Sequence, residues 1–544
     1  MVVRTRIALG RGPRANHART AHQSLKQKRL NAPASPLDPR QGLRAKTLSG
    51  LRWSFTSTGV STLIQIAHMV IMARLLAPAD FGLVALATAF LLFGTYFAQL
   101  GVGQALMQRL TLSEREIRTA FTTSALLGLL MAATFYLAAP FAEAVVQVPG
   151  VVSVIQMLAL SMVITGLGMT ALSLLQRELR FRALAVIEVG TYFVGYVLVG
   201  ITLALLGFGV WSLVFASLCQ GLLRTVAAYA MTRHASSPLL GWLEIKTLYG
   251  YGGKYSATQF LHVSRHALIT AAVGRVAGVS ALGLFDRARM LVQLPFEKLA
   301  ATVAKVLFPA MSRVQTDTQT LARIFLLQKA LIAAIFLPTL AGMAVNADVL
   351  IAVLLGPQWS EAAGIVPFLA TVVGIVFLGH FSRVMADVKA LMNQRLVIES
   401  GQLVLLAGAL LVGARYGLTG LLIAMIVAEV VAYLAYVHLM QRHLAISWNR
   451  LLKALVPGVI ATVVIGVGLT ASKIGLVDTG LPAGVLLMAQ VVLGGALLTA
   501  LWISPVFSSL RAEVLELVSP RNGIGTAPPL GTGTMIWRLL LGQR

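Results

Sequence analysis

The sequence is poor in charged residues, above all in acids, and almost free of cysteine. Only 12% of its 544 residues are charged, 57% are hydrophobic and the mean hydropathy is +0.82. Soluble domains carry roughly 25% charged residues, so an ordinary soluble domain is excluded and the chain belongs in a membrane. Cys219 is the single cysteine, which excludes an intramolecular disulfide and a thiolate metal cluster. We interpret it as a small core residue.

The few charges are unevenly distributed, with 44 Lys and Arg against 19 Asp and Glu and a net charge of +25. In a soluble protein this excess would favour a nucleic-acid partner. Here the basic residues gather in the N-terminal tail and in alternate short connections between apolar stretches. Basic residues are retained on the cytoplasmic side of membranes, so topology accounts for the charge. We therefore predict no nucleic-acid partner, and both termini in the cytoplasm.

The first 48 residues form a basic tail whose single acid is Asp38. They contain no apolar run long enough for the core of a signal peptide, so we expect a disordered cytoplasmic segment. The alternatives are a mitochondrial transit peptide, which three prolines in residues 33–39 disfavour, and a dispensable extension upstream of Leu48.

About fourteen apolar stretches approach the roughly 20 residues that a helix needs to cross a bilayer. Charged residues interrupt the eighth stretch most, so we expect that helix to turn its polar face toward protein or water. The fold class predicted is an all-α polytopic membrane protein. The stretches cover approximately residues 53–74, 82–107, 119–141, 151–175, 184–206, 210–232, 255–274, 280–308, 325–346, 362–383, 397–414, 418–440, 452–472 and 482–504.

Two sequence echoes indicate an internal repeat. Residues Arg74–Leu83 correspond to Arg275–Leu284, and Gly209–Leu213 correspond to Gly417–Leu421. Both echoes superpose helices 1–6 on helices 7–12 in the same orientation, and parallel repeats of this kind build two lobes with a site between them. The predicted units are a tail at 1–48, a six-helix lobe at 49–233, a second six-helix lobe at 246–443, helices 13 and 14 at 450–507, and a cytoplasmic tail at 508–544.

Several short motifs occur in a fixed order between residues 49 and 440: Ala73–Gly82, Leu175–Phe181, Gly207–Trp211, Leu282–Ala288, Phe308–Pro309 and Leu355–Trp359. Together they resemble the polysaccharide-transport (Wzx-type) lipid-linked oligosaccharide flippases of the MOP superfamily. The resemblance implies a V-shaped bundle whose central cavity admits an undecaprenyl-diphosphate-linked oligosaccharide. It also implies the bacterial inner membrane, with membrane lipids and the polymerase and glycosyltransferases of exopolysaccharide, O-antigen or capsule biosynthesis as partners. Relatives often carry an Asp-Asn pair where this chain has Ile269–Thr270, so a cation- or proton-linked role of that Asp is not implied here.

A diphosphate head group needs cationic donors inside the membrane, because an unpaired phosphate is costly in a medium of low dielectric constant. Arginine suits this task through its planar fork of donors. We favour Arg265 and His266 on the seventh helix, because the first helix, its counterpart in the other lobe, holds His68 at nearly the same depth. The alternatives are that Arg287 and Arg289 pair with Asp286 and that His68 is hydrogen-bonded between helices. The substrate-binding candidates are Arg265, His266, Arg287, Arg289 and His68.

The sequence shows no catalytic or metal-binding motif, so we predict a transporter, not an enzyme, with no cofactor and no metal. Gly252–Lys254 lacks the spacing of a phosphate-binding loop. Two alternatives stay open. A multidrug extrusion antiporter of the MATE type would favour acidic cavity residues, whereas helices 7 and 8 are basic. A membrane polysaccharide polymerase or ligase would need a large loop, whereas no connection exceeds about 20 residues.

Overall fold

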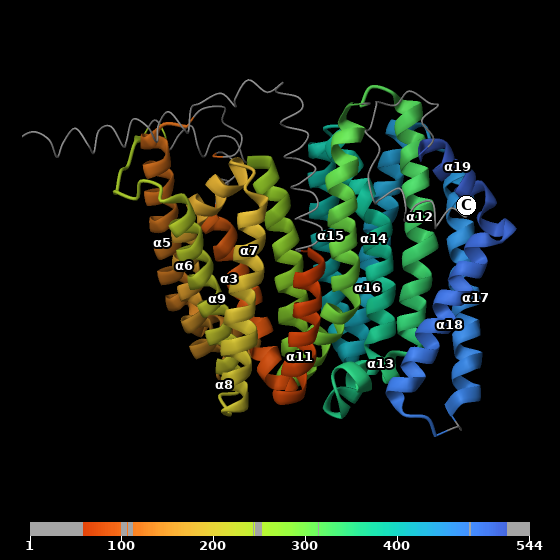
Figure 1. Ribbon diagram of the computed structural model, residues 1–544, viewed down its shortest axis with the longest axis horizontal. Coiled ribbons are helices and arrows are strands. Elements are labelled where there is room, and N and C mark those ends of the chain that lie inside the picture. Colours follow the sequence, from red (N-terminus) through yellow and green to blue (C-terminus); the bar gives the residue numbers. More distant parts are fainter. Residues whose placement is uncertain are drawn as a thin grey trace, which may run out of the picture.

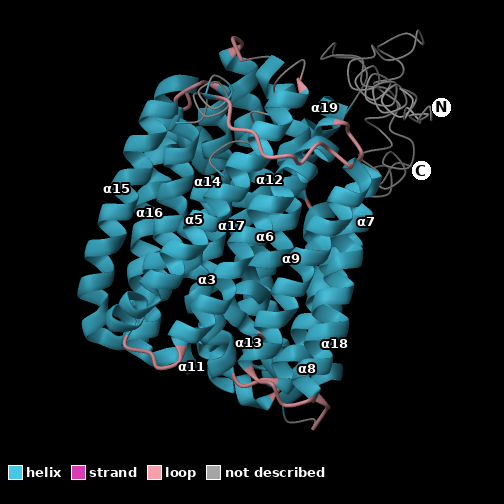
Figure 2. Cartoon of the chain, turned by 90° about the vertical axis from the view of Figure 1, so that its left-hand side faces the viewer, coloured by secondary structure: helices cyan, strands magenta, loops and turns pink. Residues whose placement is uncertain are grey.

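The computed structural model of the chain describes residues 58–99, 106, 112–242, 244, 253–313, 315–477 and 480–518. In these residues the fold is entirely helical, and no strand occurs (Figure 2). The predicted tail at 1–48 and the residues after 518 lie outside the described part of the chain.

We call residues 58–232 the N-terminal half. Its fourth span is one continuous helix whose middle, η1, winds as a π-helix. A capping box between Ser113 and Glu116 starts α5: the Ser113 amide donates to Glu116 Oε2 over 2.8 Å, and the Glu116 amide donates to Ser113 Oγ over 3.2 Å. The helices are Thr58–Leu75, α3 (Pro78–Gln99), α5 (Glu114–Val146), α6 (Val151–Arg177), α7 (Phe181–Tyr192), η1 (Phe193–Gly200), α8 (Ile201–Leu205) and α9 (Val210–Thr232).

We call residues 253–444 the C-terminal half. Its first element, α11 (Gly253–Arg313), consists of two helices that meet at Gly278, where φ is 86°. The next elements are α12 (Thr318–Val345), α13 (Ala347–Leu354), η2 (Pro357–Gly364), α14 (Val366–Val388), α15 (Met392–Gly413), η3 (Ala414–Tyr416) and α16 (Gly417–Leu444). An appendage follows, with α17 (Trp448–Val477), α18 (Ala483–Ile503), η4 (Pro505–Phe507) and α19 (Ser508–Val518).

Eleven helical stretches of the described residues are long and apolar enough to cross a membrane. Two of them run through a bend: Thr258–Glu297 contains Gly278, and Met392–Leu444 contains η3. The apolar part of α3, Pro78–Gly94, is shorter. The chain is thus an α-helical polytopic membrane protein, as predicted, whereas the number of fourteen spans stays a prediction.

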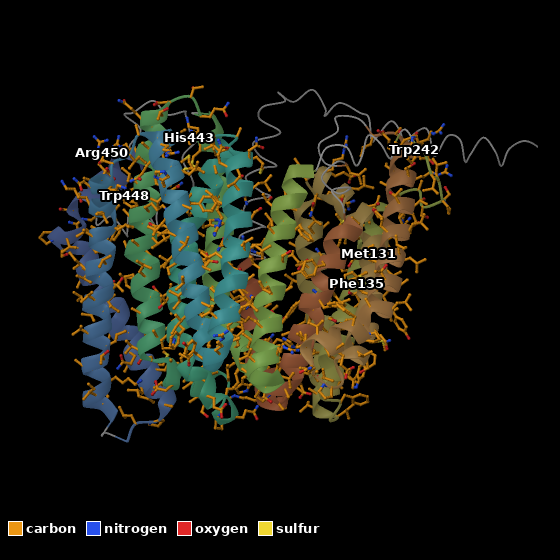
Figure 3. All side chains as sticks on the ribbon, turned by 180° about the vertical axis from the view of Figure 1, so that it is seen from behind. Met131, Phe135, Trp242, His443, Trp448 and Arg450 are labelled. Carbon is orange, nitrogen blue, oxygen red and sulfur yellow. The ribbon has the colours of Figure 1, made fainter. Side chains whose placement is uncertain are left out.

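The helices stand side by side, with the N-terminal half on one side of the bundle and α12–α19 on the other (Figure 1). Within the halves α5 packs on α6, α6 on α9, α15 on α16, and α12 on α14 and α17. Trp242, His443, Trp448 and Arg450 all lie toward one end of the bundle (Figure 3). The connections after α9 and after α16 therefore emerge at the same end, and the assignment of that end to the cytoplasm stays a prediction.

The two copies of the first sequence echo touch each other where α3 crosses the second part of α11. A Cβ atom added to Gly82 would lie 2.0 Å from the carbonyl oxygen of Val279, and one added to Gly283 would lie 1.8 Å from that of Pro78. Only glycine permits so close an approach of two backbones. Pro78 and Val279 hold the same place in the two copies, as do the two glycines, so the contact is reciprocal.

The second echo also has a structural counterpart. Gly209 precedes α9 with φ 53° and ψ −130°, and Gly417 precedes α16 with φ 66° and ψ −151°. These backbone conformations are open almost solely to glycine. Two helices at corresponding places of the two halves therefore begin in the same way, which supports the parallel repeat.

Two arginines at helix ends join the halves. Arg74 Nη2 donates to the carbonyl oxygen of Val353 over 2.7 Å, and Arg275 Nη1 donates to that of Val145 over 2.5 Å. Each arginine thus binds the backbone of the opposite half. The sequence echo pairs these two residues, and the contacts fit the structural role that their position at helix ends indicates.

The segment predicted as a cytoplasmic tail, 508–544, begins with a folded part. Its first part is helix α19, whose Leu510 and Val514 are buried against Leu327 and Ala330 of α12. The sequence Ser508–Val518 is amphipathic, and its apolar side finds a partner on α12, so these residues belong to the folded bundle.

Candidate substrate site and ion-pair network

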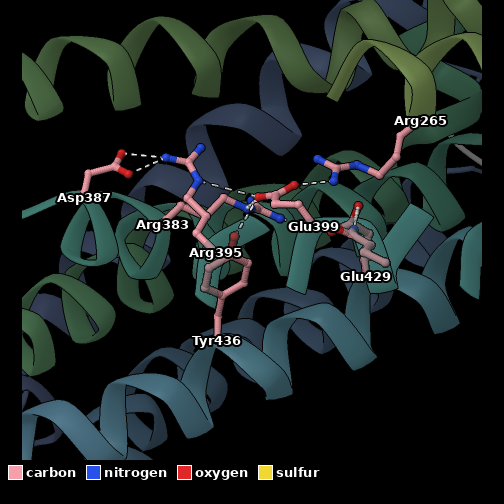
Figure 4. A network of polar contacts seen from close by, with 8 residues as sticks. Arg265, Arg383, Asp387, Arg395, Glu399, Glu429 and Tyr436 are labelled. Atoms are coloured by element: carbon pink, nitrogen blue, oxygen red, sulfur yellow. Dashed lines mark hydrogen bonds and ion pairs between the residues drawn. The ribbon is translucent and has the colours of Figure 1, made fainter. Parts of the chain in front are cut away.

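Arg265, the site residue most favoured from the sequence, is 8% exposed on the first part of α11. Its Nη1 atom donates to Oε2 of Glu399 on α15, which is 2% exposed. The hydroxyl of Tyr436, on α16, donates to the other carboxylate oxygen of Glu399 over 2.7 Å (Figure 4). The charge of Arg265 is therefore neutralised inside the protein.

Further ion pairs continue from Glu399 across three helices. Arg383 on α14 has Nε 3.4 Å from Glu399 Oε1 and Nη2 3.7 Å from Glu429 Oε2 on α16. Arg395 Nη1 lies 2.5 Å and 2.7 Å from the two carboxylate oxygens of Asp387. The ion-pair network consists of Arg265, Arg383, Asp387, Arg395, Glu399, Glu429 and Tyr436 (Figure 4).

The network includes two basic residues at the borders of a predicted connection. The apolar stretches 362–383 and 397–414 place Arg383 and Arg395 beside that connection, but both side chains are largely buried, at 17% and 15% exposure. The reason is that α14 continues to Val388 and α15 already begins at Met392, so the connection is shorter than predicted. Arg395 and Glu399 are four residues apart, a spacing that lets opposite charges pair on a helix. A prediction based on apolar length alone does not include this indication of helix.

Arg287 and Arg289 lie on the second part of α11 and share one acid. Arg287 Nη2 is 2.6 Å from Asp286 Oδ2, and Arg289 Nη2 is 3.1 Å from Asp286 Oδ1. This is the pairing that the sequence left open as an alternative. The guanidinium of Arg287 also lies 4.6 Å above the ring of Phe81 on α3, so it contacts the N-terminal half. We call Arg287 and Arg289 the arginine pair.

His68 lies on the first described helix, within an aromatic cluster. Its Nδ1 atom is 3.2 Å from the hydroxyl of Tyr192, and its ring meets Tyr192 and Tyr196 edge to face. A hydrogen bond between helices, the alternative raised from the sequence, is therefore present. Tyr196 belongs to the π-helix η1, a conformation frequent at functional sites. The charge of Arg287 acts on both His68 and Tyr192.

His266 lies one residue after Arg265 but belongs to different surroundings. The charges of Arg289 and Asp286 act on its ring. The structure thus places Arg265 in the ion-pair network, whereas His266 lies within the electrostatic influence of Arg289 and Asp286.

Several polar atoms of these predicted residues are buried and have no hydrogen-bond partner in the described part of the chain. They are Nε2 of His68, Nδ1 of His266, and the Nε atoms of Arg287 and Arg289. A buried polar atom without a partner is costly, and such atoms near two guanidinium groups suit an anionic ligand that accepts hydrogen bonds. The arginine pair carries two positive charges against one on Asp286, so an excess of positive charge remains.

Lys329 of α12, which is not among the residues predicted for the site, is fully buried. Its Nζ atom donates to the carbonyl oxygen of Leu378 and, over 2.9 Å, to Ser382 Oγ on α14. The rings of Phe325 and Tyr433 each lie with their centroid 5.0 Å from Nζ. A single lysine inside the apolar stretch 325–346 was the available signal, since intramembrane charges are rare and usually functional.

The fold and this site define a polytopic α-helical membrane protein with excess positive charge between its two halves. A sequence model described as "Polysaccharide biosynthesis protein" matches residues 71–364, more than half of the chain. The chain belongs to this family, in agreement with the motifs identified in the sequence.

Curated relatives carry related names. The lipopolysaccharide biosynthesis protein WzxC of Escherichia coli (strain K12) is 22% identical over 336 residues, covering 61% of this chain and 67% of the relative. The succinoglycan biosynthesis transport protein ExoT of Rhizobium meliloti (strain 1021) is 24% identical over 335 residues, covering 61% and 68%. The teichuronic acid biosynthesis protein TuaB of Bacillus subtilis (strain 168) is 24% identical over 333 residues, covering 60% and 68%.

Solved structures confirm the fold. The lipid II flippase MurJ in an inward closed conformation superposes with a TM-score of 0.64 at 12% identity, covering 82% of this chain and 97% of MurJ. An inward-facing MATE family transporter of the MOP superfamily gives a TM-score of 0.56 at 15% identity, covering 71% and 96%. The chain thus has the MOP fold that the sequence motifs implied.

Proposed function

We propose that the protein is a flippase that moves undecaprenyl-diphosphate-linked oligosaccharide units across the bacterial inner membrane for exopolysaccharide, O-antigen or capsule biosynthesis. The observation that carries the proposal is the arginine pair: two arginines on a membrane helix share one acid, and among the described residues their buried Nε atoms have no hydrogen-bond partner. In this proposal no covalent bond is made or broken, so the protein is a transporter, not an enzyme.

The chemistry of the substrate explains the charges. A diphosphate entering the membrane needs cationic partners that replace its water, and arginine offers several donors in a fixed plane. Arg287 and Arg289 would hold the phosphate oxygens, while His68 and His266 would donate hydrogen bonds from the N-terminal and C-terminal halves. Arg265 would act indirectly, because its bond to Glu399 fixes the first part of α11.

The comparisons support the same conclusion. The family description names polysaccharide biosynthesis, the printed name of ExoT includes transport, and MurJ, which shares the fold, is a flippase of lipid II. An exporter of cationic drugs would need an excess of acid in its cavity, whereas the arginine pair leaves an excess of positive charge. Glycosyltransferases and a polymerase of the same pathway would supply and consume the substrate.

The proposal includes an orientation. Both termini and the connection after α9 would face the cytoplasm, and the lobes 49–233 and 246–443 would move against each other around the bound head group. The basic residues in alternate connections between the apolar stretches, which include the connection after α9, support this orientation. A reporter fused after Arg233 should be active in its cytoplasmic form, and activity only outside the cytoplasm would contradict the topology.

The test of the flippase is the double substitution Arg287→Gln with Arg289→Gln. We expect flipping of the lipid-linked oligosaccharide by reconstituted protein to fall about 10- to 100-fold, the equivalent of losing one charged hydrogen bond or more. Lysine at both positions should restore part of the rate, because a point charge replaces the fork of donors. Arg115→Gln is the matched control, since the Arg115 side chain is 71% exposed and its Nε lies 3.5 Å from Glu244 Oε1.

Rate and amount must be measured on the same preparations. The proposal requires the double variant to reach normal membrane levels and to lose transport per folded molecule. Normal polysaccharide export at a normal protein level would contradict it. Loss of drug efflux with unchanged polysaccharide export would point instead to an extrusion antiporter.

A further inference from the structure

Lys329 is buried in the C-terminal half, where no carboxylate of the described residues contacts it. Within the described residues Lys329 forms no ion pair. Its partners are a carbonyl oxygen, a hydroxyl and two aromatic rings. The side chain is fully buried among α12, α14 and α16. An unpaired ammonium in such a place is costly, so its presence calls for a physical reason.

The charge balance of the surroundings supplies one. The ion-pair network contains three arginines and three carboxylates and is therefore neutral. A protonated Lys329 adds one positive charge, and a neutral Lys329 leaves the interior balanced. Arginine does not lose its proton in proteins, whereas lysine does so readily when buried. Of the four basic side chains Arg265, Lys329, Arg383 and Arg395, Lys329 is therefore the one whose charge is free to change.

We propose that Lys329 is a proton-binding site that alternates between its ammonium and amine forms as the protein changes conformation. In the step, Nζ releases one proton to water and later takes one up from water, and no other bond changes. The inference extends the proposed flippase function by naming the proton as its coupling ion.

The site accommodates both forms of the side chain. In the ammonium form, Nζ donates to Leu378 and Ser382, and the faces of the Phe325 and Tyr433 rings stabilise the positive charge. In the amine form Lys329 and the ion-pair network together carry no net charge. A group that must bind and release a proton needs both states to be tolerated, and the structure provides for each.

A path connects this site to the arginine pair. Ser382 directly precedes Arg383 on α14, and Arg383 binds both Glu399 and Glu429. Glu399 in turn holds Arg265 on α11, the element that continues past Gly278 to the arginine pair. A positive charge on Lys329 repels Arg383 on α14, so protonation would bias the position of α14 relative to α11.

Other titratable groups lie on the helices that surround Lys329. Those on α14 and α16 are His380, Arg383, Glu429, Tyr433 and Tyr436. Those on α11 and α15, which are linked to Arg383 directly or through Glu399, are His262, Arg265, Arg395 and Glu399. Elements α13, α17 and α19 also pack on α12, and α18 carries no charged residue. Their charged groups are Asp348 on α13, Arg450, Lys453 and Lys473 near the ends of α17, and Arg511 and Glu513 on α19.

The test measures conformation without substrate. In a Cys219→Ser background, spin labels on cysteines at Gln176 and Gln394, exposed positions at the same end of the two halves, report the distance between them. We expect the distance distribution of the otherwise unchanged protein to shift between about pH 6 and about pH 9, a range that spans the titration of perturbed lysines. Lys329→Met should abolish the shift, and Lys329→Arg should hold the acid-side distribution at both pH values.

Lys389→Met is the matched control, because Lys389 binds a carbonyl oxygen in an exposed connection; it should shift as the unchanged protein does. A shift that persists in Lys329→Met overturns the proposal, and so does the absence of any shift in the unchanged protein. Should Lys329→Met fail to fold, a persisting shift in Lys329→Arg overturns it equally. No flipping is measured, so the result is independent of the proposed substrate.

Discussion

The N-terminal and C-terminal halves begin α9 and α16 with the same glycine conformation, yet they bury different side chains. The buried polar residues described between 58 and 232 are serines, threonines and one histidine. Those between 253 and 444 include Arg265, Lys329 and Glu399. One half thus holds its helices together with neutral groups, and the other holds them with a chain of ion pairs.

This difference separates features that determine helix packing from features that involve charge. The reciprocal glycine contacts and the glycine-dependent helix starts occur in both halves, because they determine how the helices cross. Buried charge costs free energy wherever it occurs in a membrane protein, so its restriction to one half marks that half as the place of charge-dependent events. Four of the five predicted site residues lie there, and His68 is the one that the N-terminal half contributes.

The largest effect should follow from removing the acid at the centre of the network. Glu399→Gln leaves Arg265 buried without its partner, and breaking a buried ion pair costs about 3–5 kcal/mol. Glu188→Gln in the N-terminal half breaks a half-exposed pair with Arg224, which is worth at most about 1 kcal/mol. Thermal unfolding of both purified variants measures the difference.

Arg265→Ala should resemble Glu399→Gln, with a lower melting temperature of the purified protein. The pairing with Glu399 is the reason, since it gives Arg265 a structural task.

Equal stability losses in Glu399→Gln and Glu188→Gln would show that the two halves do not differ in the way their charges are buried.

A smaller effect should be the same in both halves. Gly82→Ala and Gly283→Ala each drive a Cβ atom into a carbonyl oxygen of the opposite half, and overpacking of this kind costs about 1–3 kcal/mol. Gly408→Ala on α15 is the control, because no atom lies within 4 Å of its added Cβ. Chemical denaturation should give similar losses for the first two variants and none for the third. A loss confined to one of them would break the reciprocity of the contact.

Most of the fold could be predicted from the sequence, because apolar length and basic connections directly reflect the membrane. The repeat could also be predicted from the sequence. Close backbone contact requires glycine at Gly82 and at Gly283, so the same residue type occurs at corresponding positions of the two copies. The ends of α14 and α15 were not predictable from hydropathy, since Arg383 and Arg395 continue the helices while interrupting the apolar runs. Their burial depends on acids from other helices.

The site was predictable in composition but not in arrangement. Arg265 and the arginine pair stand out in the sequence as intramembrane cations, but nothing near Arg265 in the sequence indicates that Glu399, far along the chain, neutralises it. Long-range pairing of this kind is a property of helix packing, and no local pattern encodes it. Lys329 was overlooked because one charge barely changes the mean hydropathy of its helix.

The smallest effect concerns two helix starts that lie outside the membrane spans. Ser113 caps α5 in the N-terminal half with a hydroxyl, and Ser113→Ala should cost about 1 kcal/mol. Asp317 caps α12 in the C-terminal half with a carboxylate, which accepts from the amides of Gln319 and Thr320 over 3.1 Å and 3.0 Å. The halves thus differ again in the use of charge.

The Asp317 cap should be sensitive to acid. Hydrogen bonds from the Thr320 side chain and amide lower the pKa of the Asp317 carboxyl below its usual range. Unfolded chains therefore take up this proton first, so the stabilisation is complete above the unfolded value of about 3.9 and disappears as the pH falls through the lower folded value. Asp317→Asn keeps an acceptor oxygen but removes the charge. Amide exchange in the first turn of α12, corrected for intrinsic rates, should be faster in Asp317→Asn than in the unchanged protein at neutral pH, and the two should converge in acid below about pH 3. A difference that stays constant down to that pH would show that the geometry of the cap, and not its charge, holds the first turn of α12.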